Sequence, residues 1–172
     1  RVDIGDKSIT KSFDISMIDE ECKYDAVVIS DYNKGFLTRT SCSEICDLFR
    51  NKGVPVFVDS KKKDLSCFSH CCIKINEREF DQAEGVPKEC QVIVTLGSRG
   101  ALYDGEVYEA DQVEVFDVCG AGDVFLSALV SFFLLTNDIK YAIIISNKCA
   151  SLSVTKIGTY TVTKRDIYDI CF

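Results

Sequence analysis

The stretch Asp117-Val118-Cys119-Gly120-Ala121-Gly122-Asp123 leads directly into the apolar run 124–130. Its two glycines allow the backbone to turn tightly, so that successive N–H groups face one concavity at the start of a predicted helix, where the helix dipole also attracts an anion. A carboxylate at Asp123 could accept a proton from a hydroxyl that attacks a bound phosphate. The stretch favours phosphoryl transfer, although a Gly-x-Gly-Asp turn is also an ordinary way to begin a helix.

The composition is that of a globular domain, and it argues against one class of function. The chain has 172 residues, of which 47% are hydrophobic and 27% charged, enough for one core. A net charge of -7 argues against a nucleic-acid-binding protein, because no basic face is available to follow a phosphate backbone. We interpret the one basic run, Lys61-Lys62-Lys63, as a solvated loop.

Neither a membrane span nor a signal peptide is predicted. The longest apolar run, 124–135, is too short to cross a bilayer, and no hydrophobic segment follows the first residues. Because the chain opens on Arg1 rather than Met, we expect further residues to precede it.

The cysteine pattern indicates buried thiols rather than a disulfide or zinc framework. Most of the ten cysteines lie within or beside apolar runs, and no Cys-x-x-Cys pair occurs. We therefore predict reduced, structural thiols in a cytoplasmic protein. The single histidine, His70, is predicted to lie in a surface loop, which argues against a Ser-His-Asp or Cys-His mechanism.

Short β-type runs alternate with helical patterns over the first half of the chain. Strands are predicted at 26–29, 54–58, 73–75 and 92–96, and helices at 43–51 and 77–84. Continuous apolar strands separated by helices are typical of a parallel sheet covered on both faces. The second half predicts a hairpin around Asp104-Gly105, a strand at 113–116, and helices at 122–135, at 140–152 and after residue 163.

Polar residues directly follow each of the first four predicted strands. Because ligands bind beyond the carboxyl ends of the strands in such sheets, these residues are candidates for a binding site. They are Ser30-Asp31, Asp59-Ser60-Lys61, Asn76 with Glu79, and Thr95 with Gly97.

Three stretches together resemble motifs of the ribokinase-like (PfkB) carbohydrate kinases. The stretch 117–123 resembles that family's signature Asp-Thr-x-Gly-Ala-Gly-Asp, Asn76-Glu77-Arg78-Glu79 resembles its Asn-x-x-Glu motif, and 94–100 resembles its nucleotide-site strand and turn. The resemblance implies an α/β, three-layer αβα ribokinase-like fold, with a mostly parallel sheet and helices on both faces. It also implies that 1–172 is one partial domain, in which 1–15 is a remnant of a lid strand and 24–172 is the core.

A second set of stretches is similar to the members of that family that phosphorylate heptose 7-phosphate at the anomeric oxygen, on the route to ADP-heptose. Residues 30–38 resemble their Ser-Asp-Tyr-x-Lys-Gly stretch, and Asp59-Ser60-Lys61 is similar to their Asp-Pro-Lys segment. Arg1-Val2-Asp3 resembles the end of their lid region. Nothing in the chain resembles the family's Gly-Gly sugar-binding motif, so we expect these 172 residues to bind ATP weakly and turn over poorly.

The resemblance implies a role for each matching residue. Asp123 would be the catalytic base, and the amides of Gly120, Ala121 and Gly122 would stabilise the transferring phosphoryl group. ATP would be bound by Asn76, Glu79, Thr95, Gly97 and Asn147. Magnesium would be bound by Glu79, and a monovalent cation such as K⁺ by Asp117. The sugar phosphate would be bound by Asp31, Lys34, Asp59 and Lys61. The family's usual Thr is Val118 here, which weakens the cation assignment.

The expected partners are therefore a small sugar phosphate and ATP, with no nucleic acid and no membrane, and a homodimer formed through the lid in the full-length protein. Two alternatives stay open on the sequence. One is a kinase for another sugar or a nucleoside, and the other is a non-catalytic relative that binds or regulates.

Overall fold

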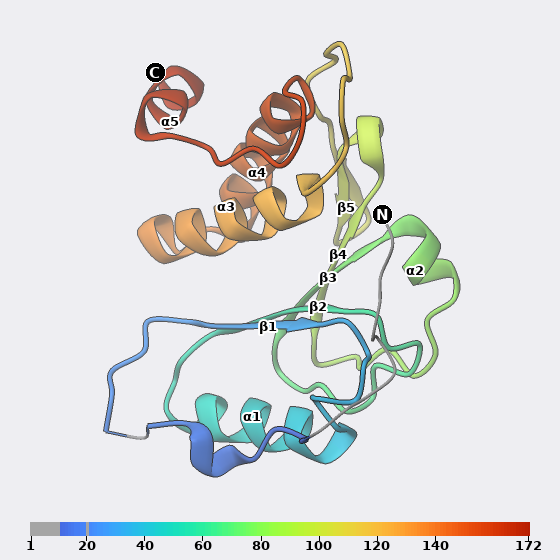
Figure 1. Ribbon diagram of the computed structural model, residues 1–172, viewed down its shortest axis with the longest axis vertical. Helices are drawn as coiled ribbons and strands as arrows, with labels where there is room; N and C mark the ends of the chain where they lie inside the picture. Colours follow the sequence, from blue (N-terminus) through green and yellow to red (C-terminus); the bar gives the residue numbers. More distant parts are fainter. Residues whose placement is uncertain (1–10, 20) are drawn as a thin grey trace. The chain divides into compact units, whose positions relative to one another are not determined.

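The computed structural model describes residues 11–19 and 21–172 (Figure 1). The chain divides into two compact units, the first ending at Val92 and the second formed by Ile93–Phe172. The predicted lid remnant lies partly outside the described residues, and Arg1-Val2-Asp3 does so entirely. In its described part, residues 11–14 have no regular structure, and the 3₁₀ helix η1 (Ile15–Met17) follows.

The first unit is built on three parallel strands, β1 (Val27–Asp31), β2 (Val56–Ser60) and β3 (Cys72–Asn76). Val27 is in register with Val56, and Phe57 with Cys72. All five residues of β2 are buried, as expected for a central parallel strand that is covered on both faces. The strands therefore end at one common edge, and their last residues are polar.

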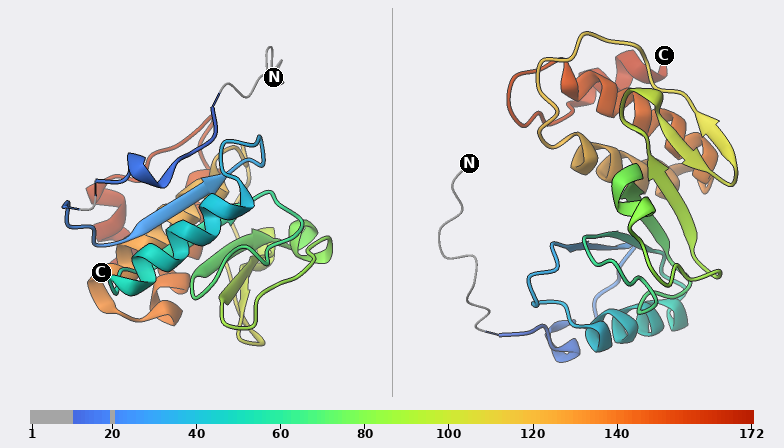
Figure 2. Two further views of the ribbon diagram at one scale, coloured as in Figure 1. Left: turned by 90° about the horizontal axis from the view of Figure 1, so that it is seen from below. Right: turned by 90° about the vertical axis from the view of Figure 1, so that its right-hand side faces the viewer.

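One helix covers a face of this parallel sheet. It is α1 (Arg39–Asn51), whose Ile45 and Phe49 share a buried core with Val58 and Ile73 of the strands (Figures 1 and 2). The helix begins four residues before the predicted start, because the Thr38 side chain caps it by accepting a hydrogen bond from a main-chain N–H of the first turn.

Three antiparallel strands follow along the chain, β4 (Gln91–Thr95), β5 (Ala101–Tyr103) and β6 (Glu106–Tyr108), with the 3₁₀ helix η2 (Gly97–Arg99) between β4 and β5. The predicted hairpin is confirmed, since both residues of its turn, Asp104 and Gly105, have positive φ. The mixed strands and helices confirm the α/β class, with parallel pairing among β1–β3 and antiparallel pairing among β4–β6.

The second unit ends in three helices, α3 (Ala121–Thr136), α4 (Ile139–Val154) and α5 (Lys164–Cys171). Helices α3 and α4 pack side by side along their lengths, and α5 packs against α4 (Figure 2). Their buried side chains include Phe125, Leu129 and Ile143.

The predicted strand at 113–116 is wrong, because these residues form an irregular segment. The side chains of Val113, Val115 and Phe116 are all exposed, so the apolar residues of this segment do not pack in the core. The Phe116 N–H donates to Val154 O at the end of α4 rather than to a strand.

Most of the cysteines are buried. All ten cysteines are free, and six of them are buried. Burial raises the pKa of the Cys72 thiol to about 12, as expected for an inert core residue. His70 lies in an exposed loop. Among the described residues, no helix has the length and apolarity needed to cross a membrane.

Candidate active site

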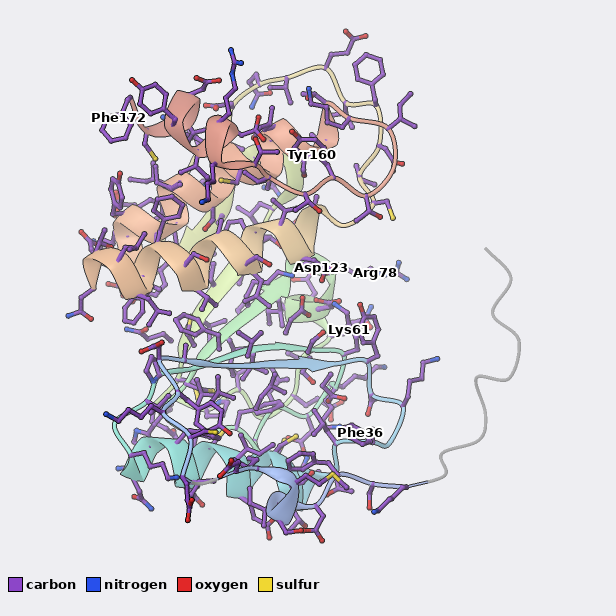
Figure 3. All side chains as sticks on the ribbon, turned by 60° about the vertical axis from the view of Figure 1, so that its left-hand side comes forward. Phe36, Lys61, Arg78, Asp123, Tyr160 and Phe172 are labelled. Atoms are coloured by element: carbon purple, nitrogen blue, oxygen red, sulfur yellow. The ribbon has the colours of Figure 1, made fainter. Side chains whose placement is uncertain are left out.

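The glycine-rich stretch forms the start of α3, as predicted. Gly120 is the N-cap in the left-handed conformation, with φ of 79°, and a Cβ there would come within 3.1 Å of the Thr159 methyl group. The Ala121 N–H donates to Val118 O at 3.3 Å, while helix geometry leaves the next N–H groups without an acceptor inside the helix. Asp123 stands in the first turn with its side chain exposed (Figure 3). This end of α3 can therefore offer both N–H donors and a carboxylate to a ligand.

Asp117 holds the loop before α3 by both of its carboxylate oxygens. Oδ1 accepts from Cys119 N at 2.9 Å, and Oδ2 accepts from Gly158 N at 3.0 Å. These two main-chain donors, that of Cys119 first, lower the pKa of Asp117. The predicted cation ligand thus ties the loop 117–119 to the turn at Gly158.

The residues predicted to line a nucleotide site in the second unit have structural contacts of their own. Asn147 is buried in α4, and its Nδ2 donates to Tyr108 O at 2.7 Å, which holds the chain just after β6. Thr95 ends β4, and Gly97 follows with a φ of 63° and open space around it. Three residues on, a Cβ on Gly100 would collide with Tyr108 O, so that position requires glycine.

In the first unit, Asn76 and Glu79 form a reciprocal cap at the start of the short helix α2 (Glu77–Asp81). Asn76 Oδ1 accepts from Glu79 N at 2.8 Å, and Glu79 Oε2 accepts from Asn76 N at 2.9 Å. The helix is shorter than predicted, but the cap fixes Glu79 directly beyond the end of β3. The neighbouring Arg78 projects into solvent (Figure 3).

Glu79 belongs to a chain of four charges that alternate in sign. Its Oε1 lies 2.7 Å from Lys61 Nζ, which lies 3.0 Å from Asp59 Oδ1. The other oxygen of Asp59, Oδ2, lies 2.6 Å from Nζ of Lys74 in β3. The structure thereby brings together three of the predicted residues, and it adds the buried Lys74, which sequence reasoning missed.

Asp31, at the end of β1, is also held by a residue that the sequence analysis did not select. Its Oδ2 lies 2.9 Å from Lys62 Nζ and accepts from Ser60 Oγ at 2.9 Å. The Asp31 side chain is 3% exposed and that of Lys62 10%. The predicted substrate residue Lys34 is exposed, three positions further along the chain.

The interpretation of 61–63 as a solvated loop is wrong for Lys62, whose side chain is largely buried against Asp31. Lys61 and Lys63 are exposed loop residues, although Lys61 also pairs with Asp59 and Glu79. A signal was available, because each strand-end carboxylate in a parallel sheet needs a cation when it is buried, and this run lies one residue beyond β2.

The donor groups suit a magnesium ion that is bound through phosphates. Glu79 offers one carboxylate, and one carboxylate with substrate phosphates and water is a usual environment for this ion. Within the described part of the chain, no three or more His, Cys, Asp or Glu side chains are gathered so as to hold a metal by themselves. The predicted metal ligands Glu79 and Asp117 belong to different units.

Comparisons with known proteins identify relatives over most of the chain. Residues 19–165 match the model of a family described as pfkB family carbohydrate kinase. The chain is 31% identical to the bifunctional protein HldE of Campylobacter curvus in an alignment of length 169 that covers 86% of this chain and 36% of that protein. It is 33% identical to the same-named protein of Desulfatibacillum aliphaticivorans, covering 83% of this chain and 34% of that protein. The chain thus spans about a third of the length of these relatives.

Solved structures confirm the ribokinase-like fold. Phosphofructokinase-2 from Escherichia coli in complex with potassium matches with a TM-score of 0.72 at 18% identity, over 87% of this chain and 57% of that one. Ribokinase from Arabidopsis thaliana, complexed with ribose and ATP, matches with a TM-score of 0.66 at 19% identity, over 83% of this chain and 55% of that one.

Proposed function

Because this chain belongs to the pfkB family of carbohydrate kinases, we propose that it transfers the γ-phosphoryl group of ATP to the anomeric hydroxyl of heptose 7-phosphate. The heptose follows from two findings together: the relatives with 31% and 33% identity are bifunctional HldE proteins, and residues 30–38 resemble the heptose kinases. The product is heptose 1,7-bisphosphate, a precursor in ADP-heptose synthesis, and we expect the reaction to occur in the cytoplasm.

The observation that carries the proposal is the exposed Asp123 carboxylate in the first turn of α3. We propose that Asp123 accepts the proton of the sugar hydroxyl as that oxygen attacks the γ-phosphorus. The main-chain N–H groups of Gly120 and Gly122 then donate to the oxygens of the transferring group, where negative charge has to be stabilised in the transition state, and that of Ala121 does so by leaving Val118 O.

The first unit supplies the groups proposed to bind magnesium and phosphate. Magnesium, when bound, neutralises charge on the ATP phosphates, and we propose that Glu79 holds it through water. Lys61 is positioned by Asp59 and binds phosphate, and Asp31 and Lys34 contact the sugar phosphate. Thr95, Gly97 and Asn147 form the nucleotide side of the site, and Asp117 takes part in a monovalent-cation site such as one for K⁺.

The decisive test is Asp123→Asn, which keeps the shape of the side chain and removes the base. We expect kcat to fall by about 10²- to 10⁴-fold, the usual contribution of a general base, with ATP affinity retained. Coupled ADP release measures turnover, and isothermal titration measures affinity.

The control is Asp111→Asn, because Asp111 is an exposed carboxylate with no described contact in the loop before α3. Unchanged turnover in Asp123→Asn would refute the proposed base and support a non-catalytic binding relative. A panel that includes other sugar phosphates, ribose and nucleosides tests the heptose assignment separately.

A further inference from the structure

Lys74 is a buried cation to which the proposed reaction gives no role. It lies in β3 between core residues, and its side chain is 5% exposed. A buried ammonium is unfavourable unless an anion compensates for the lost water. Asp59 Oδ2, at 2.6 Å, is that anion.

Asp59 connects this buried lysine to the exposed one. Its Oδ1 holds Lys61 Nζ at 3.0 Å, while Oδ2 stays with Lys74. The exposed fraction of the side chains is 5% for Lys74, 9% for Asp59 and 39% for Lys61. The inner ion pair is therefore enclosed by protein, whereas the Lys61 ammonium reaches solvent.

The ionised states of Asp59 and Lys61 are stabilised by the charged residues beside them. Burial by itself would raise the pKa of Asp59, but Lys74 and then Lys61 more than offset it, so that the pKa lies below its usual value. Burial likewise opposes the charge on Lys61, while the hydrogen bonds to Glu79 and Asp59 raise its pKa. Asp59 and Lys61 are both charged at neutral pH as a result.

The Lys61 ammonium retains capacity for a ligand. Its nitrogen carries three N–H donors, of which Asp59 and Glu79 take one each. An incoming phosphate can use the third, or it can replace Glu79, whose side chain is partly exposed at 23%. A phosphate replaces Asp59 as the partner of Lys61 less easily, because the buried Lys74 pairs with the other oxygen of Asp59.

Resting on the proposed function, we propose that Lys74 is a positioning residue: it fixes Asp59, and Asp59 in turn holds the Lys61 ammonium where it binds a phosphate group. That phosphate belongs either to ATP or to the sugar phosphate, and the two sources share the same chemistry.

The test compares Lys74→Met, Lys61→Met and the variant with both changes in the 172-residue chain. Isothermal titration with ATP and, separately, with heptose 7-phosphate measures affinity. We expect Lys61→Met to weaken binding of one ligand about tenfold or more, the loss for one charged hydrogen bond. Lys74→Met should weaken binding of the same ligand by most of that factor. The double variant should bind it no more weakly than Lys61→Met alone.

The ligand whose affinity falls identifies the source of the phosphate. Unchanged affinity for both ligands in Lys74→Met, or losses that multiply in the double variant, would overturn the proposal. Arg39→Met is the matched control, because it removes an ion pair with Asp64 in the same unit that has no contact with Lys61, and it should leave both affinities unchanged.

A pH profile separates positioning from a purely structural effect. Without Lys74, burial would raise the pKa of Asp59, so the affinity of Lys74→Met should fall more steeply than that of the wild type as pH decreases from 8 to 5. A lysine needed only for folding would lower affinity by the same factor at every pH, and that result would contradict the proposal.

A further variant covers the case in which Lys74→Met does not fold. Combining Asp59→Asn with Lys74→Met removes both buried charges together, a change that proteins often tolerate. This variant should bind as weakly as Lys61→Met, and wild-type affinity in it would overturn the proposal. If the wild-type chain binds neither ligand, the proposed function fails first. If Lys61→Met loses affinity while Lys74→Met keeps that of the wild type, only the role of Lys74 fails.

Discussion

At the scale of single residues, Asp117 shows how a candidate ligand also stabilises its loop. Its carboxylate accepts main-chain hydrogen bonds from Cys119 and Gly158, which are 39 positions apart in the sequence. Both donors favour the charged form, and they therefore lower the pKa of Asp117 in the folded chain. In the unfolded chain these donors are absent, and the pKa returns to about 3.9.

This difference predicts an acid-sensitive contribution to stability. The contribution is fully present above the unfolded pKa and is lost as pH falls through the folded value, because only the charged form gains from the two donors. We expect the free energy of unfolding of the wild type to exceed that of Asp117→Asn at pH 6, and the gap to shrink by pH 3. Urea unfolding at both pH values measures it.

Asp111→Asn serves as the reference variant for this comparison as well, since it removes an exposed carboxylate and should show no such gap at either pH. A gap between the wild type and Asp117→Asn that stays constant from pH 6 to pH 3 would show that the two hydrogen bonds do not depend on the charge.

The residues that sequence reasoning missed share one property. Lys62 and Lys74 are cations whose role depends on which carboxylate lies beside them after folding. Lys74 appears in the sequence as a polar interruption of an apolar strand, and Lys62 as the middle of a basic run. Neither pattern reveals burial by itself, whereas Asp59 and Asp31 could be selected because they lie at the ends of strands, and a buried carboxylate there indicates that a cation lies nearby.

At the scale of elements, the short helix α2 depends on its cap more than on its length. Five residues cannot form a stable helix alone, so the reciprocal hydrogen bonds of Asn76 and Glu79 determine whether it exists. We predict that Asn76→Ala costs about 1 kcal/mol locally and speeds amide hydrogen exchange over 77–81 several-fold, as measured by NMR.

Two further variants separate the cap from a direct contact of Asn76 with ATP. Asn76→Ser keeps an acceptor at the N-cap and should protect the same amides, so a loss of ATP affinity that occurs in this variant although the amides stay protected would indicate direct contact. Thr163→Ala removes the equivalent cap of α5 and should leave exchange in α2 unchanged. Unchanged exchange in Asn76→Ala would contradict the role of the cap.

The elements themselves were largely predictable, because local patterns determine them. The apolar runs at 26–29, 54–58 and 73–75 form strands, and the Asp104-Gly105 turn fixes its hairpin. The segment 113–116 has the same alternation but forms no strand, since nothing in its own sequence shows that Val154 O takes its main-chain donor. Hydrogen bonding between segments that are distant in the sequence could not be predicted from local patterns.

At the scale of the whole molecule, each of the two units carries candidate functional residues of its own. Glu79, Asp59 and Lys61 lie in the first, and Asp117, Gly120 and Asp123 lie in the second. Both units contribute polar or charged groups of the kinds that phosphoryl transfer requires, which are cations, an anion hole and a base.

The share of the relatives that the chain covers leads to the last prediction. The matches cover 55% and 57% of the two solved kinases, and nothing in the sequence resembles the family's Gly-Gly sugar-binding motif. Poor orientation of the sugar is expected to cost about a hundredfold in rate, even where the base and the anion hole are intact. We predict that kcat/KM for heptose 7-phosphate is at least about a hundredfold lower for these residues than for a chimera that adds the part of the Campylobacter curvus relative that lies N-terminal to the matched region.

Coupled ADP release from both proteins, at equal concentrations of ATP, gives the comparison. Asp123→Asn in the chimera should abolish the gain, which shows that the added segment works through the base of this chain rather than through a site of its own. Equal rates for the chimera and the 172-residue chain would mean that the sugar is oriented by residues already present, and Asp31, Lys34 and Lys61 would then be the first positions to substitute.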